Sequence, residues 1–139
     1  MNTDSEQRFA HRELTERIIG CFYRAYNTLG FGFLESVYHA ALQHKLRMAG
    51  MVAESQLPIT VHSNGVVVGE FRADLVVDGQ VLIELKAATT LDRAFEAQVL
   101  NYLRATNLEI ALLLNFGPKP QVRRLIFDNA RKTLSVSSV

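Results

Sequence analysis

With 139 residues, 48% of them hydrophobic and 21% charged, the chain is long enough to bury a core and too apolar to be disordered. We therefore expect one globular domain over residues 1–139. A formal net charge of +1 excludes a strongly basic surface as a general means of holding nucleic acid. The single cysteine, Cys21, excludes an internal disulfide, and the polar N-terminus lacks the features of a secretory signal, so we expect a cytoplasmic protein.

Two amphipathic helices are predicted first along the chain. The segment 11–29 carries apolar residues at three- and four-residue spacing and should end at Gly30: these are Leu14, Ile18, Cys21, Phe22 and Ala25. The second helix should span residues 34–48 and end at Gly50. Its core face is expected to include Leu34, Val37, Tyr38, Ala41 and Leu42. Glu35 lies against that face, where a charge either complements the helix dipole or has a function.

Strands are predicted from Gln56 onward, where the apolar period changes to two. A half-buried strand there leads through Asn64-Gly65, a hairpin signal, into a long strand over residues 66–77, with a bulge or bend expected at Gly69. After a turn at residues 78–79, residues 81–88 are apolar on both sides except for Glu84 and Lys86. This pattern is typical of a central strand that is covered on both faces.

The C-terminal part is predicted to add a third helix and two strands. The helix should span residues 91–105, with Thr89 and Asp92 at the spacing of a capping box. Strands are expected over residues 108–116 and 122–127, which gives an α/β (α+β) protein with the element order ααβββαββ. No apolar run is long enough to cross a bilayer, so we expect no membrane contact. Basic residues that follow residue 118 are expected to form a solvated surface: Lys119, Arg123, Arg124, Arg131 and Lys132.

Glu84 and Lys86 are the chemically informative residues of the central strand. They are two positions apart and therefore share a face, where burying charge is costly unless the groups are paired or bind an ion. Asp74 lies on the preceding strand. A two-residue loop at residues 78–79 would turn Asp74 away from Glu84, whereas a three-residue loop at residues 77–79 would place both on one face. The functional interpretation predicts the three-residue loop; the alternative is a buried Glu84–Lys86 or Asp74–Arg72 ion pair.

Together, Asp74, Glu84 and Lys86 would suit a hard-cation site with a lysine beside it. Carboxylate oxygens are ligands for Mg²⁺ or Mn²⁺, which retain waters and bind phosphate oxygens in their remaining positions. Such a metal would lower the pKa of a bound water and neutralise charge that develops on phosphorus. The lysine would orient or deprotonate the attacking water.

The segment GFLESVY, residues 32–38, is similar to the G-x-x-E-x-x-Y signature of a bacterial and archaeal family named for that motif. The segments FRADLVV, VLIELKA, EAQVLNYLRAT and LLLNFG resemble the same family, so that the likeness spans about residues 12–128. The family is placed in the PD-(D/E)xK nuclease-like superfamily. The resemblance implies a restriction-endonuclease-like core with a mixed central β-sheet flanked by helices.

By this resemblance, Asp74 and Glu84 would ligate the metal together with the Leu85 carbonyl, and Lys86 would be the catalytic lysine. Glu35 would complete the acidic site, as a catalytic residue or a further metal ligand. Gln98 and Tyr102 match the Q-x-x-x-Y of RecB-like members, where these residues line the active centre. The sequence departs from the motif at Ala73, which replaces its proline.

The resulting hypothesis is a Mg²⁺- or Mn²⁺-dependent nuclease that hydrolyses phosphodiesters of nucleic acid, with DNA favoured over RNA. One alternative is a non-catalytic nucleic-acid-binding or scaffold module on the same fold; another is an enzyme for a smaller phosphorylated substrate. A homodimer would supply two sites for cutting both strands, but no motif indicates one. We expect His39 to be a solvated helix residue and Tyr38 to pack with its hydroxyl at the rim of the site.

Overall fold

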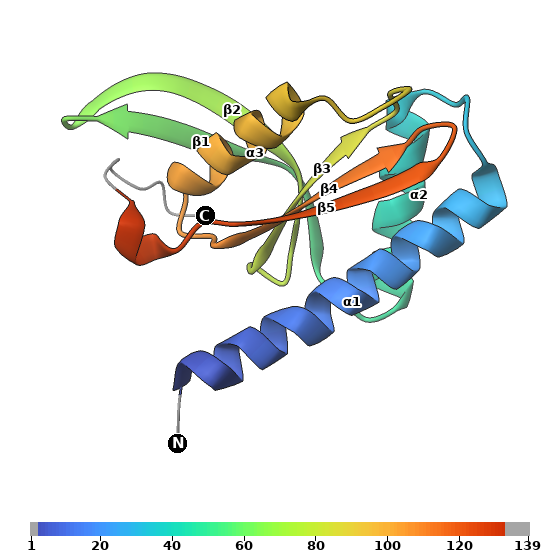
Figure 1. Cartoon of the computed structure of the whole chain (residues 1–139), viewed down its shortest axis with the longest axis horizontal. Coiled ribbons are helices and arrows are strands. Elements are labelled where there is room, and N and C mark those ends of the chain that lie inside the picture. Colours follow the sequence, from blue (N-terminus) through green and yellow to red (C-terminus); the bar gives the residue numbers. More distant parts are fainter. Residues whose placement is uncertain (1–2, 133–139) are drawn as a thin grey trace.

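A computed structural model describes residues 3–132 and has the predicted element order, ααβββαββ (Figure 1). A short 3₁₀ helix, Asn129–Arg131, follows the last strand. Residues 1–2 and 133–139 lie outside the described residues. The principal elements are α1 (Thr3–Leu29), α2 (Glu35–Met48), β1 (Ala53–Ser63), β2 (Val66–Val77), β3 (Val81–Lys86), α3 (Arg93–Arg104), β4 (Ile110–Phe116) and β5 (Pro120–Ile126).

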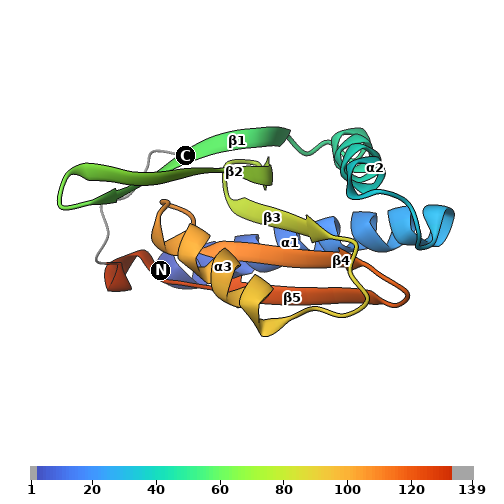
Figure 2. The ribbon, with the colours of Figure 1, turned by 90° about the horizontal axis from the view of Figure 1, so that it is seen from above.

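The five strands form one mixed sheet in the order β1-β2-β3-β4-β5 (Figure 2). Neighbouring strands are antiparallel except β3 and β4, which are parallel. A parallel pair needs a crossover connection, and α3 supplies it. Figure 1 shows the β1–β2 hairpin reaching beyond the other strands. The register shifts between Val61 and His62, opposite Gly69, where the sequence predicted an irregularity.

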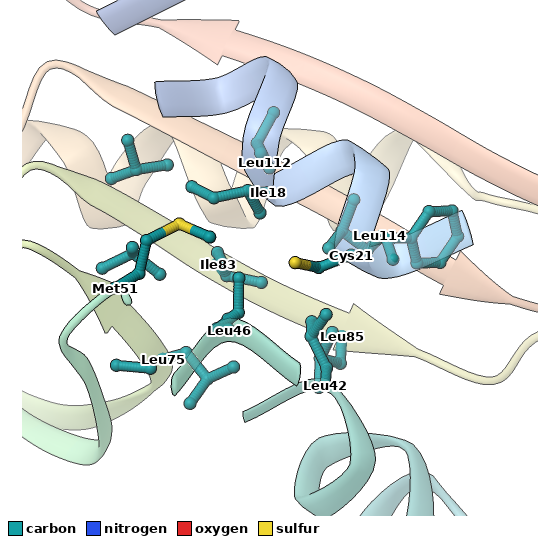
Figure 3. Close-up of a cluster of buried hydrophobic side chains, with 14 of the residues drawn as sticks. Ile18, Cys21, Leu42, Leu46, Met51, Leu75, Ile83, Leu85, Leu112 and Leu114 are labelled. Carbon is teal, nitrogen blue, oxygen red and sulfur yellow. The ribbon is translucent and has the colours of Figure 1, made fainter. Parts of the chain in front are cut away.

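The helices cover both faces of the sheet, as a mixed sheet with apolar residues on both sides requires. On one face, α1 and α2 pack against β2, β3 and β4 (Figure 3). Five apolar residues predicted for the core face of the first helix are all buried there: Leu14, Ile18, Cys21, Phe22 and Ala25. On the other face, α3 packs through Val99 and Leu103 against Val76, Leu82 and Leu113.

The loop between β2 and β3 has the three residues that the functional interpretation predicted, but it lies one position later. Val77 pairs with Val81, so the loop is 78–80 rather than 77–79. Asp78 and Gly79 both have positive φ, 51° and 63°, and the Gln80 N–H donates to the Val77 carbonyl at 2.9 Å. The observed pairing of β2 with β3 is shifted by two residues from the predicted pairing. Because side chains alternate between the two faces with a period of two, Asp74 and Glu84 remain on one face of the sheet.

Several local predictions need correction. The first helix begins at Thr3, eight residues earlier than expected. The buried face of α2 consists of Tyr38, Leu42 and Leu46 at four-residue spacing, whereas Leu34 is 76% exposed. Leu34 precedes the helix, and its side chain therefore does not follow the helical stripe. The cap of α3 is Asp92, whose carboxylate accepts from the Ala94 N–H at 2.8 Å, rather than a capping box that begins at Thr89.

The basic residues near the C-terminus are largely held by the protein itself. Arg124 donates to the Thr15 hydroxyl at 2.9 Å, and the Lys132 ammonium donates to the Thr106 and Leu108 carbonyls at 2.7 Å. Arg123 forms an ion pair with Glu96 at 3.5 Å. These groups are thus tied to neighbouring elements instead of forming a free phosphate-binding surface. None of the helices within residues 3–132 has the length and apolarity needed to cross a membrane.

Candidate active site

The centre of the candidate site is the point at which β2 and β3 separate. Their backbone pairing runs from Val77↔Val81 to Leu75↔Ile83. Beyond it, side chains replace the ladder: the Leu85 N–H donates to Asp74 Oδ2 at 2.8 Å, and the Asp74 N–H approaches Glu84 Oε1 at 3.4 Å. The two carboxyl groups are therefore brought together by the strand register and by these reciprocal contacts.

Glu84 is strongly perturbed by this environment. It is only 7% exposed, and burial, reinforced by the neighbouring Asp74 charge, raises its pKa to about 9. Lys86 opposes the shift but only weakly. Glu84 therefore carries a proton at neutral pH in the metal-free protein, because ionising it would place two negative charges side by side in a buried position.

Neither of the ion pairs considered from the sequence forms within residues 11–132. The Lys86 ammonium lies over the Phe95 ring, 4.7 Å from its centroid. Arg72 donates to the Gln56 carbonyl at 3.1 Å instead of contacting Asp74. Among the side chains of residues 11–132, no ammonium or guanidinium group thus lies within salt-bridge distance of the acid pair.

The donor set at this point suits a divalent cation. Asp74 and Glu84 provide carboxylate oxygens, and Leu85, which follows Glu84 in the chain, bonds to Asp74 through its N–H and lines the adjoining cleft. Two juxtaposed acids without a cationic partner are stabilised when a divalent ion replaces the proton. Within the described residues, no three His, Cys, Asp or Glu side chains are arranged to hold a metal. Glu35 is therefore near the acid pair without forming a third ligand position in this structure.

The cleft beside the acid pair has a volume of about 420 Å³. It lies between the start of α2, the first part of β1 and the separated ends of β2 and β3. Glu35 is mostly exposed, yet partial desolvation of its carboxyl group raises its pKa. The charge of Lys86 opposes this shift, and the charge of Asp74 adds to it. The lining residues are Glu35, Ser36, His39, Ser55, Gln56, Asp74 and Leu85.

His39, which the sequence places one turn after Glu35, lines the cleft. Its Nε2 lies 2.8 Å from the Ser55 hydroxyl, so that a hydrogen bond joins α2 to β1 across the cleft wall. His39 is only partly buried and the hydrogen bond itself is exposed, in keeping with the expected solvated histidine. The available signal was the one-turn spacing from Glu35, but the partner on β1 depends on tertiary structure.

Tyr102 approaches the acid pair from α3. Its ring stacks on Phe71 with centroids 3.7 Å apart. Burial raises the pKa of Tyr102, the charges of Glu84 and Asp74 raise it further, and a hydrogen bond with Gln98 opposes the shift. Gln98 itself is exposed, one turn before Tyr102. Tyr102 is thus the α3 residue that approaches the acid pair, Gln98 acts on it through their hydrogen bond, and neither residue is among those that line the cleft.

Tyr38 has a different place from the one predicted. It is fully buried, stacks on Phe116 at 4.2 Å, and its hydroxyl donates to the Gly30 carbonyl at 2.6 Å. The same hydroxyl accepts from the Phe33 N–H at 3.2 Å. It therefore fastens the turn that leads into Glu35, instead of lying at the rim of the cleft.

The segment after Lys86 is positioned by Asn115 on β4. The Asn115 side chain accepts from the Ala88 N–H and donates to the Ala88 carbonyl, both at 2.9 Å. Gly117 allows this close approach, since a Cβ there would lie 2.2 Å from the Ala88 oxygen. The asparagine amide thus continues the pairing of β3 and β4 past the end of the ladder and holds the chain that follows Lys86.

Comparison with known proteins agrees with this architecture. The family model described as the PD-(D/E)XK nuclease superfamily matches residues 12–125. The chain belongs to this superfamily. A solved protein, described as "Crystal structure of SSO0001", is similar with a TM-score of 0.55 and 20% identity over 67% of this chain, a likeness that shows the fold alone. The match covers 50% of that protein's length. No curated protein matches the chain.

Proposed function

We propose that this protein is a metal-dependent nuclease that hydrolyses phosphodiesters of nucleic acid, with DNA as the expected substrate. The observation that carries the proposal is the Asp74–Glu84 pair, two acids held together at the separation of β2 and β3 without a cationic partner. Membership of a nuclease superfamily supports the same reading. Within the superfamily, the GFLESVY segment supports placement in the group named for G-x-x-E-x-x-Y, with residues 1–139 as a single domain.

The proposed ligands of a Mg²⁺ or Mn²⁺ ion are Asp74, Glu84 and the Leu85 carbonyl. A bound divalent ion supplies charge neutralisation at the phosphate and lowers the pKa of a coordinated water. Binding of the ion requires Glu84 to lose its proton, so Asp74 and Glu84 are both ionised only when the metal is bound. Glu35 would add negative charge at the cleft wall nearest to Asp74.

The remaining residues have proposed roles in orientation. Lys86 would hold or deprotonate the attacking water, and the contact of its ammonium with the Phe95 ring restricts where that ammonium can reach. Tyr102 and Gln98 would position the substrate from α3, since the Tyr102 hydroxyl is close enough to the acid pair for the charges of Glu84 and Asp74 to raise its pKa. The chain would then cut one strand at a time, and cutting both strands would need a homodimer.

The test is cleavage of labelled single- and double-stranded DNA and RNA with Mg²⁺ or Mn²⁺. Wild-type protein is compared with Asp74→Asn, Lys86→Ala and a matched control, Glu70→Gln, which changes an exposed acid on the same strand as Asp74. We expect activity in wild type and control and its loss in the two site variants. An intact fold with no cleavage and no divalent-ion binding would instead support the non-catalytic module.

A further inference from the structure

The turn between α1 and α2 exposes an apolar surface directly beside the cleft. Phe31 is 62% exposed, Phe33 49% and Leu34 76%. We call these three residues the apolar turn. Glu35 and Ser36, which line the cleft, follow it immediately in the chain. Grouped exposed apolar side chains mark interaction sites more often than single ones do, and here the group is continuous with the candidate active site.

The backbone of the apolar turn is held in place. Gly30 and Gly32 have φ values of 67° and 107°, which favour glycine. The buried Tyr38 hydroxyl bonds to the Gly30 carbonyl at 2.6 Å and the Phe33 N–H at 3.2 Å, and its ring meets the Phe33 ring edge-on at 6.1 Å. A ligand that binds the exposed rings therefore meets a preorganised backbone, which reduces the entropy cost of binding.

We propose that Phe31 and Phe33 stack on unpaired bases of a single-stranded segment of nucleic acid whose phosphodiester enters the cleft. The proposal rests on the proposed function and narrows its substrate class. Proteins that bind single strands use aromatic side chains as stacking platforms, because every base has an available π-face. In a duplex those faces are already stacked on neighbouring base pairs, so exposed phenylalanines next to a phosphodiester site match unpaired bases.

The charge distribution also favours a single strand. Duplex binding depends mainly on many contacts from basic residues to phosphates. The net charge here is +1, and Arg123, Arg124 and Lys132 have partners within the protein. Lys119 is exposed in the β4–β5 turn, which lies at the same end of the molecule as the apolar turn (Figures 1 and 2).

Hydrogen bonds hold the β4–β5 turn against the end of α1. The Tyr26 hydroxyl, close to the end of α1, bonds to the Gly117 and Pro118 carbonyls at 2.7 and 2.9 Å. It therefore joins the helix that enters the apolar turn to the loop that carries Lys119. One cation at the same end of the molecule as two exposed aromatic rings suits a short single-stranded segment, with the ammonium on a phosphate and the rings on bases.

The experiment uses the absence of tryptophan from the sequence. In Phe31→Trp, the new indole is the sole tryptophan and reports base stacking through quenching of its fluorescence. The matched control is Met48→Trp, at a position 76% exposed at the far end of α2. Each is titrated in EDTA, so that metal-dependent cleavage is suppressed, with a single-stranded DNA oligonucleotide, an abasic strand of equal length and a duplex.

We expect quenching of Phe31→Trp by the single strand, much less by the abasic strand or duplex, and none in Met48→Trp. A second variant, Phe31→Leu with Phe33→Leu, keeps apolar surface but removes the rings. We expect it to bind the single strand at least about ten-fold more weakly than wild type, as measured by fluorescence anisotropy, because losing the stacking of one base alone has about this effect and two rings are removed.

Each outcome separates this inference from the proposed nuclease function. Cleavage by wild type together with unchanged binding by the leucine variant would overturn the stacking role and leave the nuclease intact. Quenching without cleavage under any divalent ion would uphold stacking and count against the nuclease. Equal quenching by abasic and normal strands, self-association that is abolished by the leucine variant, or no binding to any strand would each overturn the inference.

Discussion

Asp74 and Glu84 each use a carboxylate oxygen where β2 and β3 give up their backbone pairing. Asp74 accepts from the Leu85 N–H at 2.8 Å, and Glu84 lies 3.4 Å from the Asp74 N–H. The two carboxyl groups therefore come together at the same point at which β2 and β3 separate. The cost of this arrangement, two adjacent buried acids, is relieved in the metal-free protein by a proton on Glu84.

Asp74→Asn should reduce cleavage by at least about 100-fold, since it removes a proposed metal ligand while its oxygen can still accept from Leu85. The melting temperature should hold or rise, because without the Asp74 charge the pKa of Glu84 is raised less and keeping Glu84 protonated at neutral pH costs the folded protein less free energy. Cleavage rates and thermal melts in EDTA measure the two effects. Glu70→Gln serves as the exposed control. A melting temperature lower than that of wild type by several degrees would contradict the repulsion argument.

The free energy of unfolding should fall as pH rises. The pKa of Glu84 is about 9 in the folded protein against an ordinary value of 4.5, so between these values the folded chain keeps a proton that the unfolded chain has lost. The stabilising contribution is therefore complete below about pH 4.5 and is lost as pH rises through about 9, at up to about 1.4 kcal/mol per pH unit. Urea unfolding in EDTA at pH 5, 7 and 9 measures the slope.

Glu84→Gln should flatten that pH dependence, because the amide does not titrate in this range. Glu70→Gln should keep the wild-type slope. Identical slopes for wild type and Glu84→Gln would show that Glu84 ionises normally in the folded protein.

Binding of Mn²⁺ or Mg²⁺ should release a proton at neutral pH. The divalent ion needs the ionised form of Glu84, so its affinity should rise with pH and level off near the raised pKa of about 9. Calorimetry in two buffers of different ionisation enthalpy counts the protons released. In Glu84→Gln, the release should disappear and the affinity should fall; release that persists there would assign the proton to another group.

Asn115→Ala should destabilise the protein by about 1–2 kcal/mol, because it leaves the half-buried Ala88 N–H and carbonyl without their side-chain partner. It should also lower activity, since the segment after Lys86 loses its anchor. Asn107→Ala, an exposed asparagine before β4, is the matched control. Chemical denaturation and cleavage rates separate the two effects. Wild-type stability in Asn115→Ala would mean that water replaces the amide at no cost.

Tyr38→Phe should cost about 1–2 kcal/mol, because it removes the bonds to Gly30 and Phe33 while retaining the stack on Phe116. Cleavage should fall more than stability alone explains, since the turn leading to Glu35 loosens. Tyr23→Phe changes a 40%-exposed hydroxyl on α1 and serves as the control. Hydrogen exchange at residues 30–35 should increase only in Tyr38→Phe.

The sequence by itself determined the element order and the alternation that joins Glu84 to Lys86 on one face. Local rules were sufficient because helical and strand periods are properties of short segments. The same rules failed at Leu34 and Thr89, which lie at helix boundaries, where backbone geometry rather than side-chain period decides burial and capping. The family resemblance assigned roles at the candidate site to Glu35, Gln98 and Tyr102. No local pattern in the sequence shows that residues of separate helices approach the same site.

Tertiary structure alone decided which groups meet. The loop at 78–80 set the register that puts Asp74 beside Glu84, and the separation of β2 and β3 made both carboxyl groups available. The hydrogen bond between His39 and Ser55 and the bond from the Tyr38 hydroxyl to the Gly30 carbonyl join segments whose separation in the sequence gives no periodic signal. A sequence thus specifies which chemistry its elements carry, whereas the distances and the loss of water that shift a pKa arise only when the elements pack.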